Sequence, residues 1–195
     1  MESIIIATNN SGKLAEFQAL LSPMRCISQT TYKIIPPAET GLSFIENAIQ
    51  KARHASKISK QPALADDSGL VIPALSGRPG IHSARFAGPD ATDEENIALL
   101  LNTMKPLADQ QRHAYFYCAL ALVQTHDDPT PFIALGKLQG SIIKKPVGSH
   151  GFGYDPIFFI QAHQKTLAEL PADIKNTLSH RSMALNSLKK ELVHV

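Results

Sequence analysis

The sequence predicts a mixed α/β domain in which helices cover a β-sheet. Three observations indicate this class: an apolar strand that passes through a polar turn into a helix near the N-terminus, a long strand that is apolar on both faces, and amphipathic segments that begin with helix caps. The chain has 195 residues, 44% of them hydrophobic, which is enough to enclose a core. We therefore expect one domain spanning residues 1–195, with no linker.

The first strand is expected from Ser3 to Thr8, where three isoleucines in a row suit a covered sheet. A helical pattern follows and stops before Pro23. The turn between them, ATNNSGK, places the backbone N–H groups of Ser11 to Lys13 at a helix N-terminus, which favours an anion. It differs from a P-loop because Ala7 replaces the first glycine and Leu14 replaces the metal-binding hydroxyl. The protein ligands of any metal ion must therefore come from other parts of the chain.

Further elements follow from capping signals and apolar periodicity. Ser43 with Glu46 predicts a helix over Phe44–Ile58, with an apolar stripe that includes Ala48 and Ala52. The segment PALADDSGLVIPAL is expected to form two short strands, or a strand and a bend, with DDSG as the turn between them. A second capping pair, Thr92 with Glu95, opens a helix through residues 99–101.

The second half of the chain predicts a central strand, its neighbour and a final helix. Residues His113–Gln124 are apolar on both alternating faces, and Phe132–Leu138 is expected to pair back antiparallel after the turn HDDPTP. A loop rich in glycine and proline precedes the apolar run Ile157–Ile160. The last helix is indicated by five apolar residues at helical spacing, Met183, Ala184, Leu185, Leu188 and Leu192.

Composition excludes several classes of protein. The net charge is +2 and no basic block is present, which argues against a nucleic-acid partner. Cys26 and Cys118 are expected to be reduced and structural. No apolar run has the length of a signal sequence or a membrane span, so we expect no membrane partner and a cytoplasmic protein. The eight histidines show no zinc spacing, and GxSxG is absent, which disfavours zinc and covalent serine catalysis.

Two acidic positions are candidates for a metal site. Adjacent carboxylates on extended backbone point to opposite sides, so of Asp66 and Asp67 one should be functional and the other structural. We favour Asp67, beside Ser68 and Gly69, although an Asx-turn cap is the alternative. Glu39 lies in a loop before a capped helix, where a solvated surface charge is the alternative. One carboxylate from each place would suffice for Mg²⁺, which keeps waters and substrate phosphates as its other ligands.

Two further motifs are candidates for binding a nucleotide. In GFGYDP, Phe152 or Tyr154 could stack on a base and Asp155 could accept from a ring N–H, whereas a turn with Phe152 as a core anchor is the alternative. In LSHRSMAL, His180 and Arg181 follow Ser179 at a predicted helix start; the donor-only guanidinium suits a carbonyl or phosphate, but a surface helix terminus is the alternative. Lys13 at the strand–turn–helix junction suits phosphate.

Six blocks in order resemble the inosine triphosphate pyrophosphatase family, and within it the bacterial dITP/XTP pyrophosphatases: ATNNSGK, ETGLSFIENAIQKARHA, ALADDSGL, GRPGIHSARFAG, GFGYDPIFF and SHRSMAL. The resemblance implies an elongated mixed sheet flanked by helices, with two lobes around a nucleotide-binding cleft, usually in a homodimer. It also implies Mg²⁺-dependent hydrolysis of purine nucleoside triphosphates (ITP, dITP and XTP) between the α and β phosphates.

The resemblance further implies roles for individual residues. It gives Asp67 metal binding and proton acceptance, and Glu39 a metal role. The residues that it assigns to the substrate are Thr8, Asn9, Asn10, Ser11, Gly12 and Lys13 for the triphosphate, Ser68, Phe152, Gly153, Tyr154, Asp155 and Lys175 for the substrate and its nucleoside, and His180 and Arg181 for the base. Asn9, His82 and Ser182 depart from common family residues, which leaves the base preference open. A Maf-type pyrophosphatase that prefers pyrimidine or modified nucleotides, or a non-catalytic nucleotide sensor, is the alternative.

Overall fold

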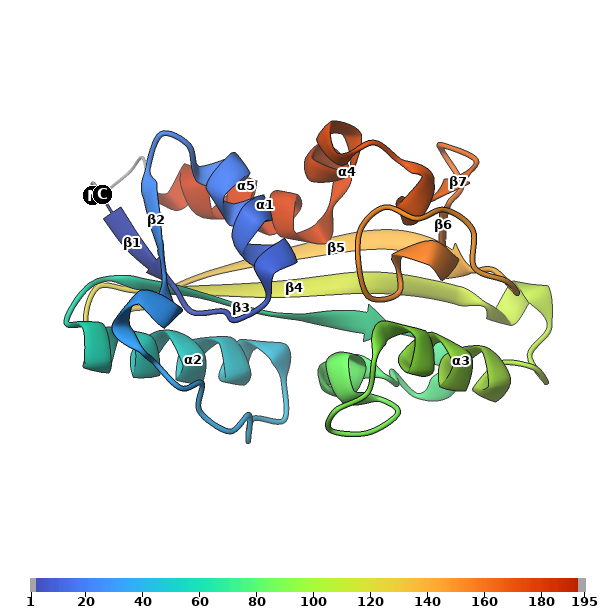
Figure 1. Cartoon of the computed structure of the whole chain (residues 1–195), viewed down its shortest axis with the longest axis horizontal. Helices are drawn as coiled ribbons and strands as arrows, with labels where there is room; N and C mark the ends of the chain where they lie inside the picture. Colours follow the sequence, from blue (N-terminus) through green and yellow to red (C-terminus); the bar gives the residue numbers. More distant parts are fainter. Residues whose placement is uncertain (1–2, 193–195) are drawn as a thin grey trace. The chain divides into compact units, whose positions relative to one another are not determined.

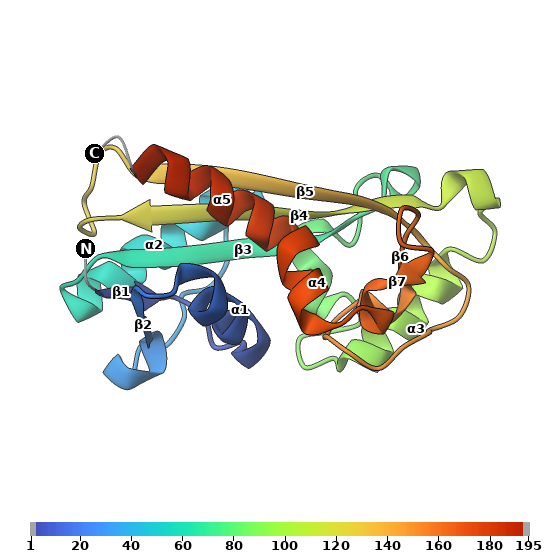
Figure 2. The same cartoon turned by 90° about the horizontal axis from the view of Figure 1, so that it is seen from above.

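In the computed structural model, which describes residues 3–192, a mixed β-sheet is flanked by helices (Figures 1 and 2). Within these residues the sheet has seven strands in the order β2-β1-β3-β4-β5-β6-β7. Strand β1 pairs in parallel with β2 and β3, whereas β6 pairs antiparallel with β5 and β7. The predicted α/β class with a mixed sheet is confirmed. The strands are β1 (Ser3–Ile6), β2 (Arg25–Ser28), β3 (Ala63–Val71), β4 (His113–Val123), β5 (Phe132–Ile142), β6 (Phe158–Ile160) and β7 (Lys165–Thr166).

The α-helices in residues 3–192 are α1 (Ser11–Leu21), α2 (Phe44–Ser59), α3 (Asp93–Thr103), α4 (Ala172–Leu178) and α5 (His180–Leu192). None of the helices within this range is long and apolar enough to cross a membrane. The chain divides into two compact units, and strands β3, β4 and β5 each contribute residues to both. The first unit comprises the described residues of 1–67, 118–136 and 181–195, and the second comprises 68–117 and 137–180.

In the first unit, α1 and α5 lie on one face of the sheet and α2 lies on the other (Figures 1 and 2). Coverage on both faces explains why β1 is a continuous run of isoleucines instead of an alternating pattern. Phe17 from α1 and Leu185 from α5 pack with Leu64 of β3 in one apolar cluster. This packing holds α1 and α5 against β3, the strand that contains Asp66 and Asp67.

The second unit has its own apolar cluster, to which β4, β6 and α3 contribute. The rings of Phe116 and Phe158 lie 4.6 Å apart, and Leu100 of α3 is fully buried. Arg112, which is 5% exposed, donates to the carbonyl oxygens of Met104 and Ile142. These bonds satisfy the hydrogen-bonding demand of a buried guanidinium with backbone acceptors.

Most predicted elements are confirmed, including both helix caps: the side chains of Ser43 and Thr92 accept from the N–H groups of Glu46 and Glu95. The predicted apolar stripe of α2 is only partly right, since the buried face is shifted to include Asn47 and Ala55. The central strand, the following strand and the C-terminal helix form where they are expected. Local patterns therefore locate the elements well.

The predicted turn at DDSG is wrong, because β3 runs without interruption from Ala63 to Val71. Gly69 is required by close packing: a Cβ there would collide with Ser83 Oγ and the carbonyl oxygen of Gly80. The two aspartates look like turn residues in sequence, but both are buried within the strand and are satisfied by ion pairs. Tertiary contacts thus override the turn propensity of the segment.

Candidate active site

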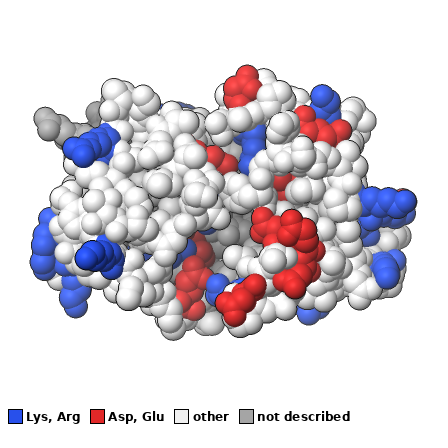
Figure 3. Space-filling model, in the orientation of Figure 1, with Lys and Arg blue, Asp and Glu red and all other residues white. Residues whose placement is uncertain are grey.

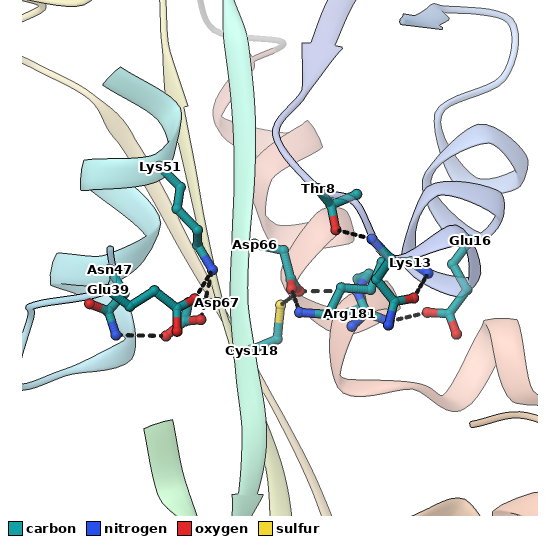
Figure 4. Close-up of polar contacts among 11 residues, drawn as sticks. Thr8, Lys13, Glu16, Glu39, Asn47, Lys51, Asp66, Asp67, Cys118 and Arg181 are labelled. Atoms are coloured by element: carbon teal, nitrogen blue, oxygen red, sulfur yellow. Dashed lines mark hydrogen bonds and ion pairs between the residues drawn. The ribbon is translucent and has the colours of Figure 1, made fainter. Parts of the chain in front are cut away.

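Asp67 lies in β3 and faces α2, where it shares a lysine with Glu39 (Figure 4). The Nζ atom of Lys51 lies 2.7 Å from Asp67 Oδ1 and 3.0 Å from Glu39 Oε1. Asn47, one turn earlier on α2, donates to Asp67 Oδ2 at 3.2 Å. The two carboxylates that the sequence offers as metal ligands are therefore brought together around one cation.

The loop that carries Glu39 is tied to α2 by amide side chains. The N–H of Gly41 donates to Asn47 Oδ1 at 2.8 Å, and Gln50 donates to the carbonyl oxygen of Ala38 at 2.8 Å. Gly41 is needed at this contact because a Cβ would lie 2.6 Å from Asn47 Oδ1. Asn47 thus connects the Glu39 loop to Asp67 through a single side chain, which holds the two carboxylates in place together.

Asp66 points to the opposite side of β3, into a second ionic cluster between α1 and α5 (Figure 4). Its carboxylate accepts from Lys13 Nζ, from Arg181 Nε at 3.0 Å and from Cys118 Sγ at 3.2 Å. Arg181 also pairs with Glu16 of α1, and its guanidinium lies over the ring of Phe17. Asp66 is 2% exposed and Arg181 1% exposed, so this cluster is a buried network.

The two neighbouring carboxyl groups have pKa values shifted in opposite directions. Burial alone would raise the pKa of Asp66, but Arg181 and Lys13 hold it well below its usual range. Burial, with a smaller contribution from Glu39, raises the pKa of Asp67 despite Lys51. Burial would lower the pKa of Lys51, but Asp67 and Glu39 raise it above its usual value. The expectation that one aspartate is structural and the other functional therefore has a clear electrostatic counterpart.

The turn before α1 is fixed by its own side chains. Asn10 caps the helix by accepting the N–H of Lys13 at 2.9 Å, and the N–H of Asn10 donates to Thr8 Oγ1 at 3.1 Å. Asn9 accepts from the buried side chain of Gln29 at 2.7 Å. The N–H groups at the first two helical positions, Ser11 and Gly12, have no acceptor within the helix by its geometry. Two backbone donors at this N-terminus are thus not used by the helix itself, and such donors are suited to an anion.

In the second unit, residues 152–155 are held by partners from other segments of the chain. Gly153 donates its N–H to Asp93 of α3 at 2.6 Å, and Tyr154 donates its hydroxyl to the carbonyl oxygen of Ser83 at 2.9 Å. Asp155 is buried and accepts from the N–H of Phe152 at 2.9 Å. Asp93, Glu94 and Glu95 lie in the first turn of α3, and acidic side chains gather over the beginning of this helix (Figure 3). Each residue from Phe152 to Asp155 is therefore held by at least one hydrogen bond.

Lys175 completes this group of contacts. Its ammonium lies 2.7 Å from Asp155 Oδ2 and 4.6 Å from the centre of the Phe152 ring. Tyr154 is 4% exposed and its ring belongs to the apolar core, so it fills the anchoring role that the sequence offered to Phe152. Burial, with Asp93 contributing, raises the pKa of Tyr154. Phe152 is the half-buried ring of the loop.

The remaining candidates occupy different places. Ser68 follows Asp67 in β3 and is half-buried. His180, 9% exposed, begins α5 and stacks on Phe116 at 4.8 Å. Arg181 lies in the Asp66 cluster of the first unit. The alternative that His180 and Arg181 form an ordinary surface helix terminus is therefore wrong.

Sequence reasoning missed five residues of these sites: Glu16, Asn47, Lys51, Asp93 and Cys118. Asn47 and Lys51 are four residues apart on one helical face beside the apolar stripe, a signal that could have identified them. Glu16 and Asp93 meet partners 165 and 60 residues away in the chain, and no local pattern announces such contacts. Within residues 3–192, no group of three or more metal-ligating side chains of Asp, Glu, His or Cys converges.

Comparison with known proteins covers nearly the whole chain. Residues 4–191 match the Ham1 family. A dITP/XTP pyrophosphatase of Legionella pneumophila (strain Paris) is 58% identical over 189 residues, 97% of each chain, and that of Escherichia coli (strain K12) is 48% identical over 190 residues, 96% of each. The structure of a HAM1 protein from Coxiella burnetii superposes with a TM-score of 0.92 at 47% identity, covering 100% of both chains. The likeness seen in the six sequence blocks is thereby confirmed, and the chain belongs to the Ham1 family.

Proposed function

We propose that this protein hydrolyses deaminated purine nucleoside triphosphates, namely dITP, ITP and XTP, to the monophosphate and pyrophosphate, and so removes them from the nucleotide pool. It is a nucleoside-triphosphate pyrophosphatase, a hydrolase of phosphoric anhydrides. The observation that carries this conclusion is the 58% identity, over 97% of both chains, to a curated dITP/XTP pyrophosphatase. The paired carboxylates and the lysine at a helix N-terminus supply the groups that such a reaction needs.

The carboxylates of Asp67 and Glu39 suit a divalent cation. They already enclose the ammonium of Lys51, so a cation between them is compatible with their positions. Two carboxylates leave room for the waters and phosphate oxygens that Mg²⁺ prefers as its other ligands. Asp67 and Glu39 would hold Mg²⁺, which would supply charge neutralisation at the phosphate oxygens.

Asp67 is the residue to which we assign proton acceptance. The reaction needs a water to attack the α-phosphorus while the bond to the bridging oxygen breaks and pyrophosphate leaves. A carboxylate oriented by Asn47 can take the proton of that water, and its raised pKa brings it closer to the working pH of a general base. No covalent intermediate is required.

Lys13 and the start of α1 are assigned to the triphosphate. The ammonium of Lys13 has three N–H donors and forms an ion pair with Asp66. The N–H groups of Ser11 and Gly12 point from the helix N-terminus, where the helix dipole favours negative charge. Together these donors would stabilise the charge that develops on the leaving pyrophosphate. Thr8, Asn9 and Asn10 shape the turn that presents them.

We assign the nucleoside to residues 152–155 of the second unit and to the beginning of α5. Phe152 would stack on the base, and the Asp155–Lys175 pair keeps that ring in place. Arg181 is 1% exposed and pairs with Asp66 and Glu16, so base selection by this residue requires the base to reach a buried guanidinium. A guanidinium donates only, and it would then favour a 6-oxo purine over adenine, whose amino group is a donor at that position. Gly153, Tyr154, Ser68 and His180 are the remaining substrate residues of this proposal.

We further propose that the active protein is a cytoplasmic homodimer without nucleic-acid or membrane partners. The substrates of the proposed reaction are free nucleotides, which are made and used in the cytoplasm. Light scattering coupled to gel filtration measures the oligomeric state directly. A monomeric mass at micromolar concentration would contradict the dimer without affecting the proposed reaction.

The decisive experiment measures pyrophosphate release from ITP, XTP, dITP, GTP, ATP and dTTP, with and without Mg²⁺. We expect Mg²⁺-dependent turnover that favours the first three substrates, and its loss in Asp67→Asn. Asp109→Asn is the matched control, because the side chain of Asp109 is 72% exposed and its ion pair is with Lys144, a surface residue. A preference for dTTP would instead indicate a Maf-type enzyme, and nucleotide binding without turnover would indicate a sensor.

A further inference from the structure

Lys51 is placed where a metal ion would be expected. Its ammonium lies between Asp67 Oδ1, at 2.7 Å, and Glu39 Oε1, at 3.0 Å, with only 12% of its side chain exposed (Figure 4). Asp67 and Glu39 are themselves 7% and 22% exposed, so both carboxylates are largely removed from water. Lys51 thus compensates part of the negative charge of two neighbouring carboxylates that would otherwise repel each other.

We infer that Lys51 is a built-in counter-ion of the Glu39–Asp67 pair, and that its ammonium must withdraw before a divalent cation binds there. This inference rests on the proposed function only for the position of the metal. Mg²⁺ contacts oxygen at about 2.0–2.1 Å, closer than an ammonium does. A divalent ion on the same two oxygens would therefore face a neighbouring positive charge at short range, and one cation must replace the other.

The contacts around the pair permit this exchange without dismantling the site. Asp67 uses Oδ1 for Lys51 but Oδ2 for Asn47, so Asn47 still orients the carboxylate when the ammonium leaves. The loop that carries Glu39 is held separately, through Gly41 and Asn47 and through Gln50. Lysine has a flexible four-carbon stem, so its ammonium can move while the helix backbone stays fixed.

This arrangement makes metal affinity the outcome of a competition within the protein. A metal-free site keeps its carboxylates neutralised by Lys51, and a metal-bound site must first lose that interaction. Removing the positive charge while keeping the apolar stem should therefore strengthen metal binding. A lysine that merely supports the local structure would have the opposite effect, because its loss would disturb the carboxylates and weaken the site.

Isothermal titration of the purified full-length protein with Mg²⁺ alone, without nucleotide, tests the exchange. Lys51→Met should bind Mg²⁺ about tenfold more tightly than the parent protein, because one competing charge is removed at short range. Lys51→Gln, which keeps a donor but not the charge, should change affinity in the same direction. Lys57→Met is the matched control, since Lys57 lies exposed on the same helix, and it should leave the affinity unchanged.

Unchanged or weaker Mg²⁺ binding in both Lys51 variants, in protein that is folded by circular dichroism, overturns the inference. Adding Glu39→Gln to Lys51→Met should abolish the gain; a gain that persists would place the metal elsewhere and would also overturn it. The proposed reaction is judged separately, by pyrophosphate release from ITP in the parent protein. A parent enzyme that turns over ITP while Lys51→Met shows no gain retains the proposed function and loses this role of Lys51.

Discussion

Replacing Asp66 by asparagine should destabilise the protein far more than the same replacement of Asp67. The carboxylate of Asp66 is 2% exposed and accepts from Lys13, Arg181 and Cys118. Asparagine has one acceptor oxygen and an NH₂ group that can only donate, so it would set a donor against donors in a buried site. Arg181 would also keep its charge, with Glu16 as its remaining carboxylate in this cluster.

Removing one partner of a buried ion pair costs about 3–5 kcal/mol, against a total stability of roughly 5–15 kcal/mol for a typical domain. Asp67→Asn should cost no more than about 1 kcal/mol, because burial already disfavours the charge of Asp67 and Lys51 keeps Glu39 as a partner. Equilibrium unfolding in urea, followed by circular dichroism, measures both values.

The comparison also separates structure from catalysis. We expect Asp67→Asn to be folded but inactive. We expect the main effect of Asp66→Asn to be a lower free energy of unfolding. The reasoning would be refuted by a loss below about 1 kcal/mol in Asp66→Asn, or by equal losses in the two variants, because either result would mean that the buried network does not carry the predicted cost.

The same contacts support three other predictions. The folded pKa of Asp66 is depressed, so its stabilising contribution is complete above its unfolded pKa of about 3.9 and is lost as pH falls through the folded value. The difference in free energy of unfolding between the parent protein and Asp66→Asn should therefore be constant from about pH 7 to 5 and shrink below about pH 4. Asp93→Ala should raise KM for ITP about tenfold with kcat little changed, because the N–H of Gly153 loses its charged acceptor. Glu94→Ala removes the next acidic side chain of the same first helical turn and should leave KM unchanged. Equal effects of the two substitutions on KM would indicate that the acidic residues act through the helix dipole. Chelation of divalent metal by EDTA should stop pyrophosphate release but leave the urea midpoint of unfolding unchanged, because Lys51 neutralises the carboxylates of Glu39 and Asp67. A large fall in the midpoint would contradict this role of Lys51.

The features that sequence predicted well are those with local causes. Apolar periodicity and the caps at Ser43 and Thr92 located the helices, because the signals and the resulting elements lie within one turn of each other. The alternation of side chains along extended backbone was enough to assign Asp66 and Asp67 to opposite sides of the chain. These inferences depend only on backbone geometry, which does not change with tertiary context.

What sequence could not provide was the set of partners. Arg181 is assigned to base recognition by resemblance, yet its Nε and Nη1 atoms contact Asp66 and Glu16, which lie 115 and 165 residues away in the chain. The error at DDSG has a similar origin, since Gly69 resembles a turn residue but is small in order to admit Ser83 and Gly80. Both facts depend on packing between distant segments, which leaves no short-range pattern in the chain.

The placement of both aspartates on one continuous strand makes the alignment of that strand with its neighbour essential. Strand β3 is aligned with β1 by the pairs Ile5 with Ala63 and Ile6 with Leu64. A slip by one residue turns every side chain to the other face, so it would send Asp67 toward the side of Arg181 and Asp66 toward the side of Lys51. Inserting or deleting a single residue in this strand should therefore be far more damaging than most substitutions, because it would exchange the two electrostatic environments at once.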